Sequence, residues 1–117
     1  MFDYHMQLRT FKKQKPLDDS LDDFIITVSD WDEESNKMVS FCVVQIYYFG
    51  ENAHEIVKFD SAHGHCHMHR YYRRLNDEGE PIEKDNSPAA FDEFRNDVKE
   101  NWRKYKRLYV EKWLSDK

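Results

Sequence analysis

Three consecutive segments of the chain have the composition of β-strands and are separated by turns too short for a crossover connection. The segments are 24–31, which is rich in β-branched and aromatic residues, 38–49, which is apolar on both faces, and 53–61. The connections 32–37 and 50–52 carry the turn-forming residues Ser, Asn and Gly. Because a parallel return needs a crossover of about a dozen residues or more, these strands must pair as antiparallel hairpins. Segment 38–49 is expected to have a strand neighbour on each side, since a long apolar edge strand would aggregate.

Further elements are expected on either side of this series. Segment 65–74 is the next candidate strand, segment 4–11 is an earlier one, and the polar segment 76–87 has the composition of a loop. Strand alternation places one set of side chains in 65–74 on one face, namely His65, His67, His69 and Tyr71. The other face carries Cys66 and Met68, which are expected to be buried against the helix.

The C-terminal segment has the clearest helical pattern. Ser87 is a suitable N-cap, and Pro88 occupies the first helical position, where its missing N–H is not needed. Apolar residues then recur at steps of three or four, which predicts a buried stripe made of Phe91, Phe94, Val98, Trp102, Tyr105, Tyr109 and Trp113. We therefore expect a single α+β domain over residues 1–117, with an antiparallel sheet of four or five strands packed against one long C-terminal helix.

Composition limits the classes of protein that this chain can belong to. The net charge is −5, which argues against a general nucleic-acid coat protein, although residues 17–34 hold eight acids and residues 99–112 six bases. The sequence shows no apolar run long enough to span a bilayer and no signal-peptide core, so we expect a cytoplasmic protein without a membrane partner. In that compartment the two cysteines, Cys42 and Cys66, are expected to be reduced.

The histidine-rich segment is the strongest candidate for chemistry, because four of the six histidines lie within residues 63–69. Two neighbouring imidazoles on a strand, such as His65 and His67, could bind zinc or nickel together with a ligand from elsewhere. The same segment could cleave RNA without a cofactor. In that hypothesis His67 or His69 is the general base, the other histidine or Tyr71 is the acid, and Arg70 and Arg73 hold phosphate. The preceding strand would supply Asp60 or Glu55 to orient an imidazole.

Two further interpretations stay open at this point. The histidines can be ordinary strand residues with no chemical role. The protein can also be a non-catalytic interaction module whose basic helix binds an acidic partner.

The segment Val57-Lys58-Phe59-Asp60-Ser61-Ala62-His63-Gly64, followed by alternating histidines, resembles the core of TumE-like toxins and of small prokaryotic proteins of unknown function. The resemblance covers about residues 41–74 and implies a toxin of a toxin–antitoxin pair, with RNA-directed activity and a DNA-binding antitoxin as partner. It carries over Asp60, His63, His67 and His69 as site positions. We therefore expect a small toxin-type ribonuclease that needs no metal. Both a monomer and an oligomer are compatible with the sequence. The expected catalytic residues are His67, His69, Arg70 and Tyr71, and the expected binding residues are His63, His65, Asp60 and Arg73.

Overall fold

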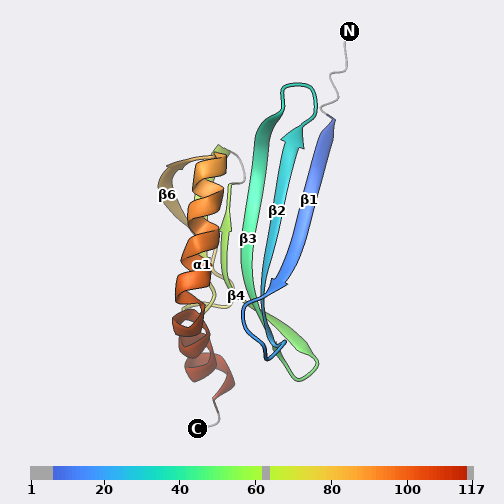
Figure 1. Ribbon diagram of the computed structural model, residues 1–117. Coiled ribbons are helices and arrows are strands. Elements are labelled where there is room, and N and C mark those ends of the chain that lie inside the picture. Colours follow the sequence, from blue (N-terminus) through green and yellow to red (C-terminus); the bar gives the residue numbers. More distant parts are fainter. Residues whose placement is uncertain (1–6, 62–63, 116–117) are drawn as a thin grey trace.

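The computed structural model describes residues 7–61 and 64–115, which form one antiparallel sheet and one C-terminal helix (Figure 1). The sheet has six strands in chain order, β1 (Leu8–Pro16), β2 (Asp23–Asp32), β3 (Lys37–Phe49), β4 (Asn52–Asp60), β5 (His65–Arg70) and β6 (Glu80–Asp85). Helix α1 (Pro88–Tyr109) continues into a π-helical turn, η2 (Val110–Leu114). The α+β class and the antiparallel pairing are confirmed, but the predicted strand number of four or five was wrong.

The two edge strands explain the error in strand number. β6 lies inside segment 76–87, which was predicted to be a loop, and β1 begins and ends later than the candidate strand 4–11, whose first three residues lie outside the described residues. All nine residues of β1 are exposed, and in β6 only Ile82 is partly buried. An edge strand that buries so little has no alternating apolar pattern to reveal it, and Pro81 is tolerated there because its missing N–H can face outward.

The helix packs on one face of the sheet through the predicted apolar stripe, except that Trp113 lies in η2 and is exposed, so its predicted burial was wrong. Ser87 caps α1 by accepting a hydrogen bond from the Ala90 backbone N–H at 3.1 Å. Of the first five stripe residues, Phe91 is half-buried against the Phe41 ring, and the other four are buried, namely Phe94, Val98, Trp102 and Tyr105. The sheet supplies the other side of this core from its central strands, with Phe41 and Val43 in β3 and Ile56 and Phe59 in β4.

β3 lies between β2 and β4, as predicted from its apolar composition. The helix lies mainly over β3 and β4, while β1 and the neighbouring part of β2 project to one side of it (Figure 1). Of the described residues, none belongs to a helix that is long and apolar enough to cross a membrane. Cys42 and Cys66 are both free thiols.

The face of the sheet that points away from α1 carries the ionisable side chains of β4 and β5 discussed below, and we call it the open face. Strand register aligns four polar side chains of β4 and β5 on it, because Asp60 lies opposite His67 and Lys58 lies opposite His69. The intervening residues Phe59 and Met68 belong to the core under the helix. The open face is therefore defined here by Cys42, Val44, Lys58, Asp60, His67 and His69.

Candidate functional site

The alternation of side chains along β5 is as predicted. Cys66 is fully buried and Met68 is buried, and both contribute to the core that packs against α1. His65 is exposed, whereas His67 and His69 are half-buried on the open face. His63, which the sequence also placed in the site, lies outside the described residues.

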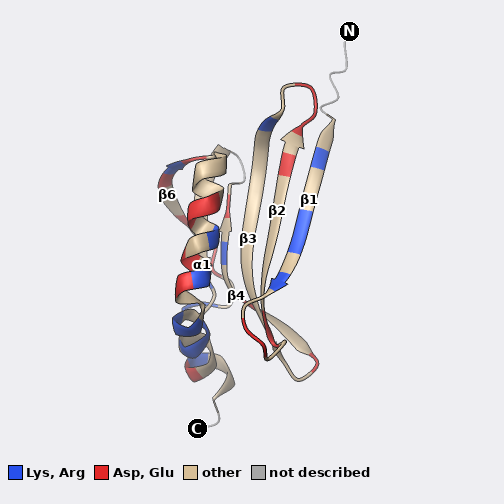
Figure 2. Cartoon of the chain, viewed as in Figure 1, with Lys and Arg blue, Asp and Glu red and all other residues tan. Residues whose placement is uncertain are grey.

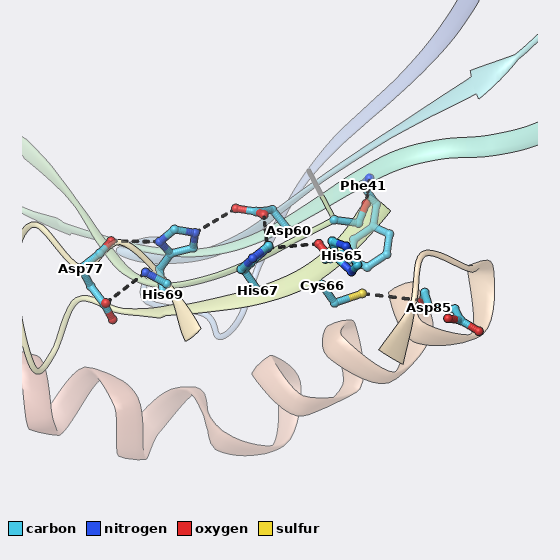
Figure 3. A network of polar contacts seen from close by, with 10 residues as sticks. Phe41, Asp60, His65, Cys66, His67, His69, Asp77 and Asp85 are labelled. Carbon is cyan, nitrogen blue, oxygen red and sulfur yellow. Dashed lines mark hydrogen bonds and ion pairs between the residues drawn. The ribbon is translucent and has the colours of Figure 1, made fainter. Parts of the chain in front are cut away.

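Asp60 brings the two half-buried histidines together (Figure 3). Its Oδ2 lies 3.0 Å from Nε2 of His69, and its Oδ1 lies 3.9 Å from Nδ1 of His67. All three side chains are largely shielded from solvent, with exposed fractions of 17% for Asp60, 28% for His67 and 14% for His69. Of the two carboxylates that the sequence offered as partners, Asp60 is therefore the one in contact with both imidazoles.

Both ring nitrogens of His69 are occupied. Its Nδ1 lies 2.9 Å from the backbone carbonyl oxygen of Asp77, which can only accept a hydrogen bond, so this nitrogen carries a proton. Its Nε2 lies 3.0 Å from Oδ2 of Asp60, so the second ring nitrogen also has a partner. This arrangement fixes the ring and leaves no lone pair for a substrate, which favours a positioning role for His69 over the role of general base.

His67 is held differently, and its outer nitrogen is available. Its Nδ1 lies 3.1 Å from the backbone carbonyl oxygen of His65 and must therefore donate a proton to it. The neutral ring then carries its lone pair on Nε2, for which the structure shows no hydrogen-bond partner within residues 7–61 and 64–115. An imidazole with a fixed tautomer and a free Nε2 has the geometry that a general base or a metal ligand requires.

The loop after β5 completes the support of His69. The Asp77 carboxylate accepts hydrogen bonds from the backbone N–H groups of Arg70, at 2.6 Å, and Gly79, at 3.1 Å. Burial acts to raise the pKa of Asp77, but these two bonds outweigh it and lower the pKa. Gly79 has a φ of +95° and lies so close to His69 that a Cβ there would be 2.8 Å from Cε1 of the ring. The polar composition of residues 76–87 predicted only a loop and gave no signal for Asp77 or Gly79.

The positions of Arg70, Tyr71 and Arg73 differ in part from those predicted. β5 ends at Arg70 and not at residue 74, so Tyr71 lies in a turn, although its ring still stacks on His69 with centroids 5.8 Å apart. The Arg70 guanidinium pairs with Glu80 at 2.8 Å, which competes with the phosphate-binding role expected for it. Arg73 is 62% exposed, and together with Arg74 and residues 76–80 it lines a pocket of about 410 Å³ next to the Asp77 loop.

Lys58 is a further member of the site that sequence analysis did not single out. It lies on the open face opposite His69, two residues before Asp60. Burial acts to lower the pKa of Lys58, but the nearby ionisable groups of Tyr71, Cys42, Asp60 and Glu55 outweigh it, so its pKa is raised and the amine stays charged. Strand alternation between Lys58 and Asp60 was the signal that could have identified it.

The metal hypothesis lacks a complete ligand set in the part of the chain that the structure describes. Across residues 7–61 and 64–115 there is no group of three or more His, Cys, Asp or Glu side chains that could hold a metal ion. A zinc or nickel site built on His65 and His67 would therefore need another ligand from outside these residues.

Comparison with known proteins identifies the family without adding an activity. Searches of curated proteins and of solved structures each returned no match. The family model described as Domain of unknown function (DUF7718) matches residues 11–115, a range that runs from within β1 to one residue beyond η2. Because the match covers most of the chain, this protein belongs to the DUF7718 family.

Proposed function

We propose that this protein is the toxin of a toxin–antitoxin pair and cleaves RNA without a metal, with His67 as the general base. The observation that carries the catalytic part of the proposal is the free Nε2 of a half-buried imidazole whose tautomer is fixed by the His65 carbonyl. The toxin part depends on the resemblance of residues 57–69 to TumE-like toxins. An antitoxin protein and RNA are the partners in this proposal, and the cytoplasm is its location.

The reaction that suits this geometry is an attack by the ribose 2′-hydroxyl on the adjacent phosphorus. Nε2 of His67 accepts the hydroxyl proton, the new O–P bond forms, and the bond from phosphorus to the 5′ oxygen breaks. His65 on the same face, about 7 Å along the strand, is placed to return a proton to the leaving oxygen. The products are a 2′,3′-cyclic phosphate and a free 5′-hydroxyl, so atoms and electrons balance without a cofactor.

Positive charge around the histidines supports this choice of substrate. Lys58 on the open face can stabilise the extra negative charge of the pentavalent phosphorus. Arg73 and Arg74 in the neighbouring pocket can bind a flanking phosphate, for which the exposed Arg73 would have to leave Glu80, 3.8 Å from its guanidinium. In this proposal His69 and Asp60 have a structural role. They hold each other and the Asp77 loop in position, and neither has to contact the RNA.

The proposal is tested by cleavage of a labelled single-stranded RNA in the presence of EDTA. We expect the purified protein to produce 2′,3′-cyclic phosphate ends, and we expect His67→Gln to lower the cleavage rate by about 100-fold or more. His54→Gln is the matched control, because His54 contacts Tyr109 near the end of the helix and lies outside the proposed site. Expression of the wild type should also arrest growth, and expression of His67→Gln should not.

Three results would contradict the proposal. Absence of RNA cleavage would remove the catalytic part, and equal cleavage by wild type and folded His67→Gln would remove His67 from the mechanism. Loss of cleavage in EDTA, restored by zinc or nickel, would instead support the metal-binding alternative at His65 and His67.

A further inference from the structure

β1 is an open edge of the sheet. It pairs along its whole length with β2, and no strand among the described residues lies on its other side (Figure 1). All nine of its residues are exposed, including the apolar Leu8 at 48% and Phe11 at 46%. An edge strand of this length offers unpaired backbone N–H and C=O groups to another extended chain.

The charge of β1 is of one sign. The strand carries four bases, Arg9, Lys12, Lys13 and Lys15, and no acid, and it forms a basic stripe along the edge (Figure 2). Within the described part of the chain, none of the three lysines forms an ion pair. Four bases within nine residues repel one another, so the strand has electrostatic complementarity for a negatively charged neighbour.

The fold adds more positive charge on the helix side of this edge. Lys13 and Lys15 line a small hollow of about 20 Å³ together with Arg95 and Lys99 of α1. The hollow lies over Ile25 and Thr27 of β2. Arg95 is partly neutralised by its ion pair with Asp92, but Lys99 has no ion-pair partner among the described residues. Residues about 80 positions apart in the sequence therefore meet to form one cationic surface.

We infer that β1 is a docking edge for an acidic, extended segment of a partner protein, which adds to the sheet as a seventh strand. Backbone hydrogen bonds to β1 would supply affinity, and acidic side chains opposite Lys13 and Lys15 would supply specificity. Apolar residues on the other face of the segment would cover Leu8. This surface is separate from the histidine site, so the inference stands independently of RNA cleavage.

A second copy of this chain is a poor occupant of the same edge. Antiparallel pairing of two β1 strands about Lys12 would place Arg9 opposite Lys15 and Lys12 opposite its own copy. Like charges directly opposite each other destabilise a strand pair. The same lysines that would attract an acidic segment therefore oppose self-association.

The test uses a fluorescent nine-residue peptide in which Glu alternates with Val, and the same peptide with Lys in place of Glu. We expect saturable binding of the Glu peptide at low salt, with slower hydrogen exchange of β1 amides in the complex, and no binding of the Lys peptide. Lys13→Glu combined with Lys15→Glu should weaken binding by about tenfold or more, since attraction is replaced by repulsion. Lys104→Glu combined with Arg107→Glu, which makes the same charge change at exposed helix positions, should leave binding within about twofold.

Each other outcome would overturn the inference. Absence of binding, or equal binding of the two peptides, would remove β1 as an acidic docking edge. Equal loss of binding in the Lys104 and Arg107 variant would move the interaction to the helix. Displacement of the peptide by a labelled single-stranded RNA that binds more tightly at Lys13 and Lys15 would identify the edge as a nucleic-acid surface.

Discussion

The position of the His69 ring depends on the absence of a side chain at Gly79. The ring of His69 occupies the space that a Cβ of Gly79 would need, at 2.8 Å from Cε1. Gly79→Ala should therefore displace the ring, break its bond to the Asp77 carbonyl, and lower the free energy of unfolding by about 2–4 kcal/mol. Urea unfolding measures the loss of stability, and the imidazole NMR signals of His69 measure the displacement.

Gly50→Ala is the matched control for that change. Gly50 also has a positive φ, +63°, but no atom lies within 4 Å of its missing Cβ. Its substitution carries only the backbone cost of about 1–2 kcal/mol and should leave His69 undisturbed. Equal losses of stability in the two variants, with an unchanged His69 signal in Gly79→Ala, would mean that the contact between Gly79 and His69 does not support the site.

The Asp77 carboxylate should make the stability of the protein depend on pH. Its pKa is lowered from 3.8 in the folded protein, despite burial, because its carboxylate accepts two backbone hydrogen bonds. A carboxyl with a lowered folded pKa contributes stability that is present above the unfolded pKa and is lost as the pH falls through the folded one. Wild type should therefore be more stable than Asp77→Asn at pH 7, and the difference should shrink below about pH 4. A difference independent of pH in urea unfolding would contradict this role of the Asp77 charge.

The sequence identified Asp60 on β4 and the histidines on β5, but it missed Lys58 of β4 and the loop residues Asp77 and Gly79. Alternation along β5 was sufficient to place His67 and His69 on one face, and the preceding strand supplied Asp60. Asp77 and Gly79 reach His69 only because the chain reverses after Arg70, and no periodicity encodes where a reversal of this kind returns. The assignment of a proton to each imidazole likewise needed the carbonyl oxygens of His65 and Asp77, which no residue type reveals.

At the scale of an element, α1 is held mainly by the side chains that were predicted to be its stripe. Trp102 is 4% exposed, and its carbonyl accepts a hydrogen bond from the buried amide of Gln45 at 2.9 Å. Trp102→Ala should lower the free energy of unfolding by about 3–5 kcal/mol, because it leaves a cavity between helix and sheet. Trp113→Ala is the control, since Trp113 is 37% exposed and contacts Tyr71 through one hydrogen bond. Similar losses in the two variants, measured by urea unfolding, would show that the helix is not anchored at Trp102.

The helix and strands that bury the most apolar side chains are the ones whose bounds were predicted best from the sequence. The central strand β3 was predicted to within one residue, and the start of helix α1 at Pro88 was predicted correctly. Burial makes β3 a nearly continuous apolar run and imposes a period of 3.6 on the apolar residues of α1. β5 was predicted to extend to residue 74, since Tyr71 and Tyr72 suit a strand, yet the chain turns after Arg70. β6 was missed because its sequence EPIEKD contains a single apolar side chain.

The whole molecule is elongated, with principal extents of 61 × 28 × 26 Å, and its stability should be unevenly distributed. The covered part of the sheet packs residues such as Val43 and Phe59 against α1, whereas β1 is exposed along its whole length. Local separation of β1 from β2 therefore exposes little new apolar surface and should require much less free energy than global unfolding.

Native-state hydrogen exchange measures this difference. Those β1 amides that bond to β2 should exchange at least about 100-fold faster than the amides of β3 that bond to β4, which corresponds to about 2.7 kcal/mol. The comparison is restricted to hydrogen-bonded amides in both strands, so that simple exposure of the outer edge does not enter. Equal protection of β1 and β3 would show that the sheet opens as a single cooperative unit and that β1 is not a separately accessible edge.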